Sequence, residues 1–144
     1  MMTPTDPIAH QNVQADVLQH LALTHELMEK KGLPRSLSHL IELRVSQINQ
    51  CAFCVKMHTT DARADGETNE RLDRLIVWRQ VSDFTDAEKA AFAWAEALTC
   101  IEEQTDYGAL RAELRAHYED EMISLITVCI TMLHLWNRIQ VSAH

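Results

Sequence analysis

Glycine and proline are scarce in this sequence, with three of each among 144 residues. Both residues interrupt helices, so their scarcity beside many Ala, Leu, Glu and Arg residues favours helix throughout the chain. No stretch shows the alternation of apolar and polar residues that is typical of a β-strand. The composition therefore predicts an all-α fold, a helical bundle, and a chain of this length fits a single domain.

Three kinds of segment are also missing. The start of the chain has neither the basic region nor the apolar core of a secretory signal, and polar residues interrupt the longest apolar-rich stretch, from Met122 to Val141. There is no basic run, and the formal net charge is −8. We therefore expect a cytoplasmic protein that binds neither membrane nor nucleic acid. Four cysteines in such a chain point to redox or metal chemistry rather than to structural disulfides.

Apolar residues recur at helical spacing along most of the chain, which defines the expected helices. Residues 1–7 are expected to form a loose tail before a helical domain of residues 8–144. Helices are expected from Ile8 to Lys30, from Arg35 to about Gln47, from Cys51 to about Ala64, after a Thr68 cap, after a capping box at Thr85–Glu88, from Tyr107 to His117, and from Asp120 onward. The break between the second and third of these helices falls at Asn49-Gln50.

Cys51, Cys54 and His58 lie on one expected helix. At 100° per residue, their side chains fall within an arc of about 60°, stacked over two turns. Residues three and four positions apart on a helix are within side-chain reach of each other. If the helix begins at Cys51, its free amides and dipole stabilise a thiolate there. The spacing therefore favours a redox-active pair with a histidine beside it.

This arrangement suits thiol redox chemistry. A thiolate attacks a peroxide or a disulfide, and a second thiol then closes an internal disulfide. His58 suits a general base, because the ordinary pKa of histidine is near neutrality. The residues thus predict a thiol-dependent peroxidase or disulfide oxidoreductase that needs no cofactor.

Two other interpretations remain open at this point. Cys51, Cys54 and His58 could supply three zinc ligands, with Glu42, His39 or His134 as the fourth. The cysteines could also be inert buried thiols, which is our expectation for Cys100 and Cys129. We expect His134 to be a hydrogen-bonded core residue, and the remaining histidines outside these sets to be solvated: His10, His20, His25, His117 and His144.

The segment Ser46-Gln47-Ile48-Asn49-Gln50-Cys51-Ala52-Phe53-Cys54-Val55-Lys56-Met57-His58 resembles the core of the AhpD-like branch of the carboxymuconolactone decarboxylase family. The resemblance extends to residues 62–68, 93–99 and 136–138. It implies a helical protein that assembles into trimers or hexamers and reduces hydroperoxides. Cys54 would then be the attacking thiol, Cys51 the resolving thiol and His58 part of a proton relay. The resemblance also implies an external thiol reductant, a lipoylated protein.

Relatives that lack the cysteines decarboxylate a lactone, so a decarboxylase-like enzyme is one alternative. A non-catalytic oligomer that senses oxidation or binds metal is another. The cysteine pair favours the peroxidase over both.

The chain departs from the family pattern at three positions. The relay glutamate of the family commonly stands twelve residues before the first cysteine, where this chain has His39, and the nearest acid is Glu42. A fold-back at the Asn49-Gln50 break would bring Glu42 level with Met57 and His58, and His39 level with Thr60. We therefore predict Glu42 as the acid that orients His58. Gln50 replaces a common glycine, which a left-handed turn would favour.

Lys56 is the third departure, since many relatives have Asp there. Replacing an acid by a base near the cysteine pair should favour thiolate.

Overall fold

Nine helical segments and no strand make up the computed structural model, which describes residues 1–144. The segments are α1 (His10–Val13), α2 (Ala15–Lys30), α3 (Arg35–Ile48), α4 (Ala52–Ala64), α5 (Asn69–Arg74), the 3₁₀ helix η1 (Leu75–Gln80), α6 (Asp86–Thr99), α7 (Tyr107–Arg115) and α8 (Asp120–Val141). The predicted all-α, single-domain fold is confirmed. Residues 1–7 contain no helix and are exposed, and their mobility stays a prediction.

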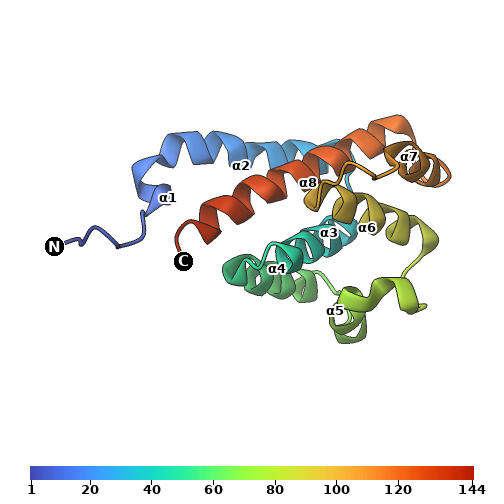
Figure 1. The fold of residues 1–144 in the computed structure, drawn as a ribbon, viewed down its shortest axis with the longest axis horizontal. Coiled ribbons are helices and arrows are strands. Elements are labelled where there is room, and N and C mark those ends of the chain that lie inside the picture. The colour runs from blue at the N-terminus through green and yellow to red at the C-terminus, as the bar shows by residue number, and fades with distance from the viewer.

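Helix α3 is the centre of the bundle and packs against α4, α6 and α8 (Figure 1). Helix α7 packs on α6 and α8, and α2 runs along α8 at the edge of the molecule. The largest fully buried apolar side chains come from α3, η1, α6, α7 and α8: Phe92, Leu40, Ile41, Leu43, Leu75, Leu114, Ile126, Ile130, Leu133 and Val45. The site described below lies at the junction of α3, α4 and α8, with α2 over it.

Most predicted helix starts and ends agree with the structure. Thr68 caps α5, and both hydrogen bonds of the Thr85–Glu88 capping box are present. Two predicted helices are wrong in detail. The first is interrupted at Gln14, whose φ and ψ are −126° and 45°, so α1 and α2 are separate. The helix after Thr68 changes into the 3₁₀ helix η1, which contains a non-helical Val77.

The reversal between α3 and α4 is held by a partly buried polar network. Asn49 donates from Nδ2 to Asn137 Oδ1 at 3.0 Å and to His134 Nδ1 at 3.2 Å. Asn137 in turn donates to the Ser46 hydroxyl at 3.1 Å. Since nearly all buried polar groups in proteins find partners, this satisfied network fixes the end of α3 against α8. His134 is hydrogen-bonded as predicted, but it is half-buried rather than part of the core.

Helix α8 is long and apolar enough to cross a membrane, with a mean hydropathy of 1.4 over 18 residues. Core helices meet the same criteria, so length and composition alone carry no conclusion. In this fold α8 packs against α2, α3, α6 and α7, which agrees with its predicted place in a bundle.

Gln50 adopts a left-handed conformation, with φ of 55°, directly after the network. A side chain raises the energy of this conformation, whereas glycine tolerates it. We expect Gln50→Gly to increase the free energy of unfolding by about 0.5–1 kcal/mol, measured by chemical denaturation. The matched control is Gln47→Gly, which lies within α3 and should reduce it by about 1 kcal/mol. A loss of stability in Gln50→Gly would contradict this account of the turn.

Candidate functional site

The two cysteines of the predicted pair lie at the start of α4. Cys51 is the residue just before the helix, and its backbone is extended, with φ of −88° and ψ of 97°. Its sulfur accepts a hydrogen bond from the Cys54 backbone N–H at 3.3 Å. Free amides at a helix start stabilise negative charge, and thiolates at such positions are favoured. Cys51 is therefore well placed to carry a thiolate when the pair is reduced.

Cys51 and Cys54 form a disulfide, with Cα atoms 5.3 Å apart. This separation lies in the ordinary range for disulfides, so the pair can open and close without a large backbone movement. The exposed fractions of the two residues are 0% and 2%. Cys54 nevertheless lines a cavity, whereas Cys51 does not. A small molecule in the cavity therefore meets Cys54 first.

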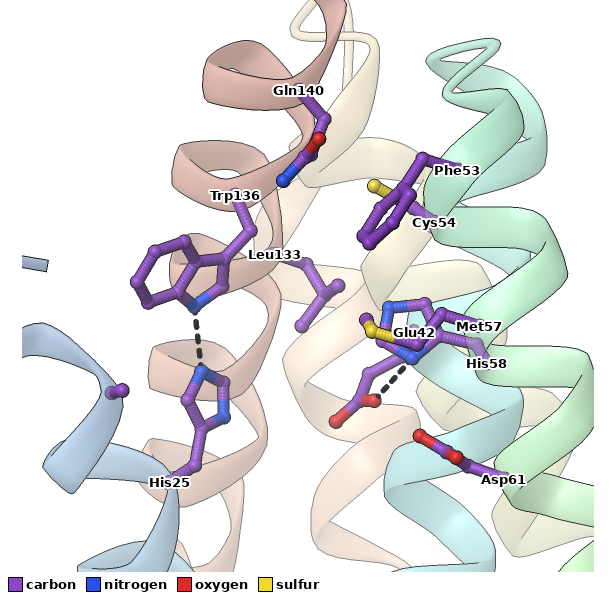
Figure 2. A pocket seen from close by; sticks show the side chains of 11 residues that line it. His25, Glu42, Phe53, Cys54, Met57, His58, Asp61, Leu133, Trp136 and Gln140 are labelled. Carbon is purple, nitrogen blue, oxygen red and sulfur yellow. Dashed lines mark hydrogen bonds and ion pairs between the residues drawn. The ribbon is translucent and has the colours of Figure 1, made fainter. Parts of the chain in front are cut away.

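An acid and an imidazole meet across the interface between α3 and α4. Glu42 Oε2 lies 2.9 Å from His58 Nδ1, and both side chains are largely buried. The reversal at Asn49-Gln50 brings residues 42 and 58 level, as the sequence predicted. The contact with Glu42 occupies Nδ1, so Nε2 is the nitrogen of His58 that can exchange a proton with the cavity. Figure 2 shows this second nitrogen on the side of the ring away from Glu42.

Cys54, His58 and Glu42 all line one cavity of about 370 Å³. The other lining residues are Ala22, His25, Phe53, Met57, Asp61, Leu133, Trp136 and Gln140. Figure 2 shows α8 on one side, α4 on the other, and the Glu42–His58 pair between them. Mostly apolar walls with a few convergent polar groups are typical of sites for small molecules.

His25 is a wall of this cavity rather than a solvated surface residue, so that prediction was wrong. The Trp136 indole donates from Nε1 to His25 Nε2 at 2.7 Å, with ring centroids 6.2 Å apart. Burial lowers the pKa of His25, an effect that Glu42 partly opposes. No local pattern in the sequence connects two residues so far apart in the chain, although Trp136 lies in a segment that resembles the family.

His39 takes no part in this cavity. Its Nε2 lies 2.6 Å from Asp65 Oδ2, rather than beside Thr60 as predicted. Asp65 follows α4, so this contact ties the end of α4 to the start of α3, and it lowers the pKa of Asp65. His39 lines a second, smaller cavity of about 170 Å³, which Glu42 and His25 also reach. The interface thus holds two acid–imidazole pairs, of which only Glu42–His58 lies beside the cysteines.

The other two cysteines differ from each other. Cys129 is buried as predicted, and its sulfur lies 4.0 Å from Glu42 Oε1. Burial raises the pKa of the Cys129 thiol, and Glu42 adds to the effect, so this cysteine stays protonated and unreactive. Cys100 was predicted to be a core residue but is exposed, because it ends α6 at the surface.

The alternative of a zinc site finds no support in the arrangement of ligands. No group of three or more His, Cys, Asp or Glu residues is arranged to hold a metal ion. Two of the candidates for a fourth ligand are engaged elsewhere, since His39 contacts Asp65 and His134 contacts Asn49 and Thr99. Of the remaining histidines, His20, His117 and His144 are exposed as predicted, and His10 is half-buried against Ser142.

Comparisons with known proteins agree on one family. The sequence model of the carboxymuconolactone decarboxylase family matches residues 16–97. The uncharacterised protein YdfG of Bacillus subtilis is 36% identical over 114 residues, which are 79% of this chain and 78% of YdfG. The uncharacterised protein YnjA of Escherichia coli is 28% identical over 110 residues, 75% of this chain and 60% of YnjA.

Two crystal structures share the fold. One is a protein of unknown function from Agrobacterium tumefaciens, for which a role as the antioxidant defence protein AhpD has been proposed. Its TM-score is 0.89, with 34% identity over 96% of this chain and 95% of that one. The other is a peroxidase-related protein from Silicibacter, with a TM-score of 0.78 and 18% identity over 90% of this chain and 69% of that one. From the family match and these relatives, the chain belongs to the carboxymuconolactone decarboxylase family, as an AhpD-like member.

Proposed function

We propose that this protein reduces small hydroperoxides to alcohols, with Cys54 and Cys51 as its redox-active thiols. The observation that carries the proposal is that Cys54 shares one cavity with the Glu42–His58 pair. A reactive thiol needs a base that takes its proton and an opening through which substrate reaches the sulfur. The role in antioxidant defence that has been proposed for the Agrobacterium relative agrees with this function.

In the first step His58 takes the proton of the Cys54 thiol, and Glu42 stabilises the imidazolium through Nδ1. The Cys54 thiolate attacks the terminal oxygen of the hydroperoxide, an S–O bond forms, and the O–O bond breaks. The leaving alkoxide receives a proton from His58 and departs as the alcohol. Cys54 is left as a sulfenic acid, oxidised by two electrons.

In the second step Cys51 closes the disulfide. The Cys51 sulfur accepts a hydrogen bond from the Cys54 amide at the start of α4. This sulfur attacks the sulfur of the Cys54 sulfenic acid, an S–S bond forms, and water is released. The product corresponds to the disulfide seen in the structure. Because Cys51 is fully buried and does not line the cavity, it is shielded from the peroxide and suits the resolving role.

An external dithiol returns the pair to the reduced state. Its thiolate attacks the Cys54 sulfur from the cavity, and Cys51 leaves as a thiolate that the start of α4 stabilises. The second thiol of the reductant then releases Cys54 and becomes a disulfide itself. The resemblance to AhpD favours a lipoylated protein as this partner.

The direct test is peroxide turnover with different reductants. We expect the reduced protein to consume an alkyl hydroperoxide with dihydrolipoamide, and to do so more slowly with a monothiol, because a dithiol resolves its own mixed disulfide. Consumption no faster than that by the reductant alone would overturn the proposal. So would full activity in a Cys51→Ser/Cys54→Ser double variant.

The roles of the two thiols can be separated by trapping sulfenic acid after one equivalent of peroxide. We expect Cys51→Ser to form a stable sulfenic acid at Cys54, because the resolving thiol is gone, whereas Cys54→Ser should form none at Cys51. Cys100→Ser is the matched control, because this exposed cysteine lies outside the site. Label in Cys54→Ser but not in Cys51→Ser would reverse the assignment.

The acid–imidazole pair should control the rate of the first step. We expect His58→Ala to slow peroxide reduction by about 10²-fold or more, since general base catalysis typically contributes that much. Glu42→Gln should also slow it, because the imidazolium loses its negative partner. His39→Gln provides the control, since His39 belongs to the pair away from the cysteines. An equal loss in all three variants would contradict a specific role for Glu42 and His58.

We extend the proposal to assembly as a homo-oligomer larger than a dimer, a trimer or hexamer. Large apolar side chains are exposed on α1, η1 and α8, among them Val13, Ile76, Val77, Val128 and Val141. Exposed apolar surface of this kind is typical of an interaction site. Light scattering at micromolar concentration should report an oligomer, and a monomer would contradict this part of the proposal.

A further inference from the structure

The hydrogen bond between His25 and Trp136 joins α2 to α8 along one wall of the cavity. An indole nitrogen can only donate, so the Nε2 atom of His25 must accept and cannot carry a proton. The bond therefore exists only while His25 is neutral, with its single proton on Nδ1. Protonation of Nε2 replaces an attraction by a contact between two donors.

The opposite wall is formed by α4. Phe53 and Met57 line the cavity there and are 54% and 40% exposed, so they lie at its mouth. Figure 2 shows the Trp136 indole directed toward His25, with Phe53 and Cys54 on the opposite side of the cavity. The separation of the two walls therefore decides how large a molecule can reach the Cys54 sulfur.

Helix α2 is held weakly against the rest of the bundle. Met28 is the only buried residue among its sixteen, and Leu23 and Leu27 are exposed. The bond from Trp136 is the one side-chain hydrogen bond between α2 and another helix, beside an exposed ion pair of Glu29 with Arg35 at 3.6 Å. An element with so few buried contacts opens at low free-energy cost, so the loss of one bond matters.

Building on the proposed peroxidase activity, we propose that the His25–Trp136 hydrogen bond is a gate over Cys54. With the bond formed, only small hydroperoxides reach the sulfur. When the bond breaks, as when His25 takes up a proton, α2 and the indole move apart and bulkier hydroperoxides enter. The two residues thus determine substrate size, and the size limit relaxes in acid.

Charged groups from several elements surround His25. The titratable or charged side chains that line the two cavities with it are Glu29 of α2, Arg35, His39 and Glu42 of α3, Cys54, His58 and Asp61 of α4, and Cys129 of α8. Burial lowers the pKa of His25 below its ordinary value, Glu42 raises it and His58 lowers it. The gate is therefore closed at neutral pH, and it opens as the pH falls below the ordinary histidine value of about 6.5.

The test measures access to Cys54 without using peroxide. The reduced protein is alkylated with iodoacetamide or with a bulky aryl maleimide, and the labelling rate of the Cys54 peptide is followed by mass spectrometry. The ratio of the two rates cancels the thiolate fraction, because both reagents attack the same thiolate. At about pH 8, where histidine is neutral, the wild-type ratio should favour the small reagent.

Three variants test the gate. Trp136→Phe keeps an aromatic ring but loses the hydrogen-bond donor, and His25→Leu loses the acceptor. Each variant should raise the labelling rate with the bulky reagent, relative to the rate with the small one, by about three- to tenfold. This factor corresponds to the net free energy of one neutral hydrogen bond. His25→Gln can still accept the bond but does not titrate. The control is Trp94→Phe, which removes an indole bond to Thr127 away from the cavity and should leave the ratio unchanged.

The dependence on pH gives the second readout. Between about pH 8 and pH 5, the wild-type ratio should approach that of Trp136→Phe, while His25→Gln should keep its closed value. The gate would be overturned if Trp136→Phe and His25→Leu both had the same ratio of labelling rates as the wild type. It would also be overturned if the ratio in His25→Gln changed with pH as it does in the wild type. If the protein reduced no peroxide, the proposed function would fail, whereas these labelling ratios would still decide the gate.

Discussion

The reversal of the chain between α3 and α4 is the constraint on which the rest of the site depends. Asn49 anchors it by donating to both His134 and Asn137 of α8. His134 must be neutral there, because its Nδ1 accepts a hydrogen bond from Asn49 and so carries no proton. Its single proton is on Nε2 and is donated to the Thr99 hydroxyl, since that hydroxyl already donates its own proton to the Ala95 carbonyl. Burial accordingly lowers the pKa of His134. A hydrogen-bonded network in which every group is satisfied favours one geometry, and this one fixes the position of Cys51 at the start of α4.

Two consequences follow from this reversal. It places Cys51 at a helix start, where its sulfur accepts an amide hydrogen. It also makes α3 and α4 antiparallel neighbours, so that Glu42 meets His58 beside Cys54, and His39 meets Asp65 at the end of α4. The same backbone feature therefore brings together the groups that we propose as resolving thiol, proton acceptor and orienting acid.

Sequence alone predicted the parts of the site that depend on local spacing. The stacking of Cys51, Cys54 and His58 follows from helical periodicity, and the pairing of Glu42 with His58 follows from counting outward from the break at Asn49-Gln50. The wall formed by His25 and Trp136 could not be predicted in this way, because the two residues are 111 positions apart and meet only through tertiary packing. Cys100 was placed in the core because apolar neighbours surround it in sequence, but the helix ends there at the surface.

The central claim is that Cys51 and Cys54 together deliver two electrons to one hydroperoxide. The most direct measurement is a single turnover of the fully reduced protein with one equivalent of an alkyl hydroperoxide, without any reductant. The products are then counted as alcohol formed, thiols lost and disulfides mapped by mass spectrometry. We expect one alcohol and one Cys51–Cys54 disulfide for each peroxide, with Cys100 and Cys129 still reduced. Unchanged thiols, or oxidation confined to Cys100, would contradict it.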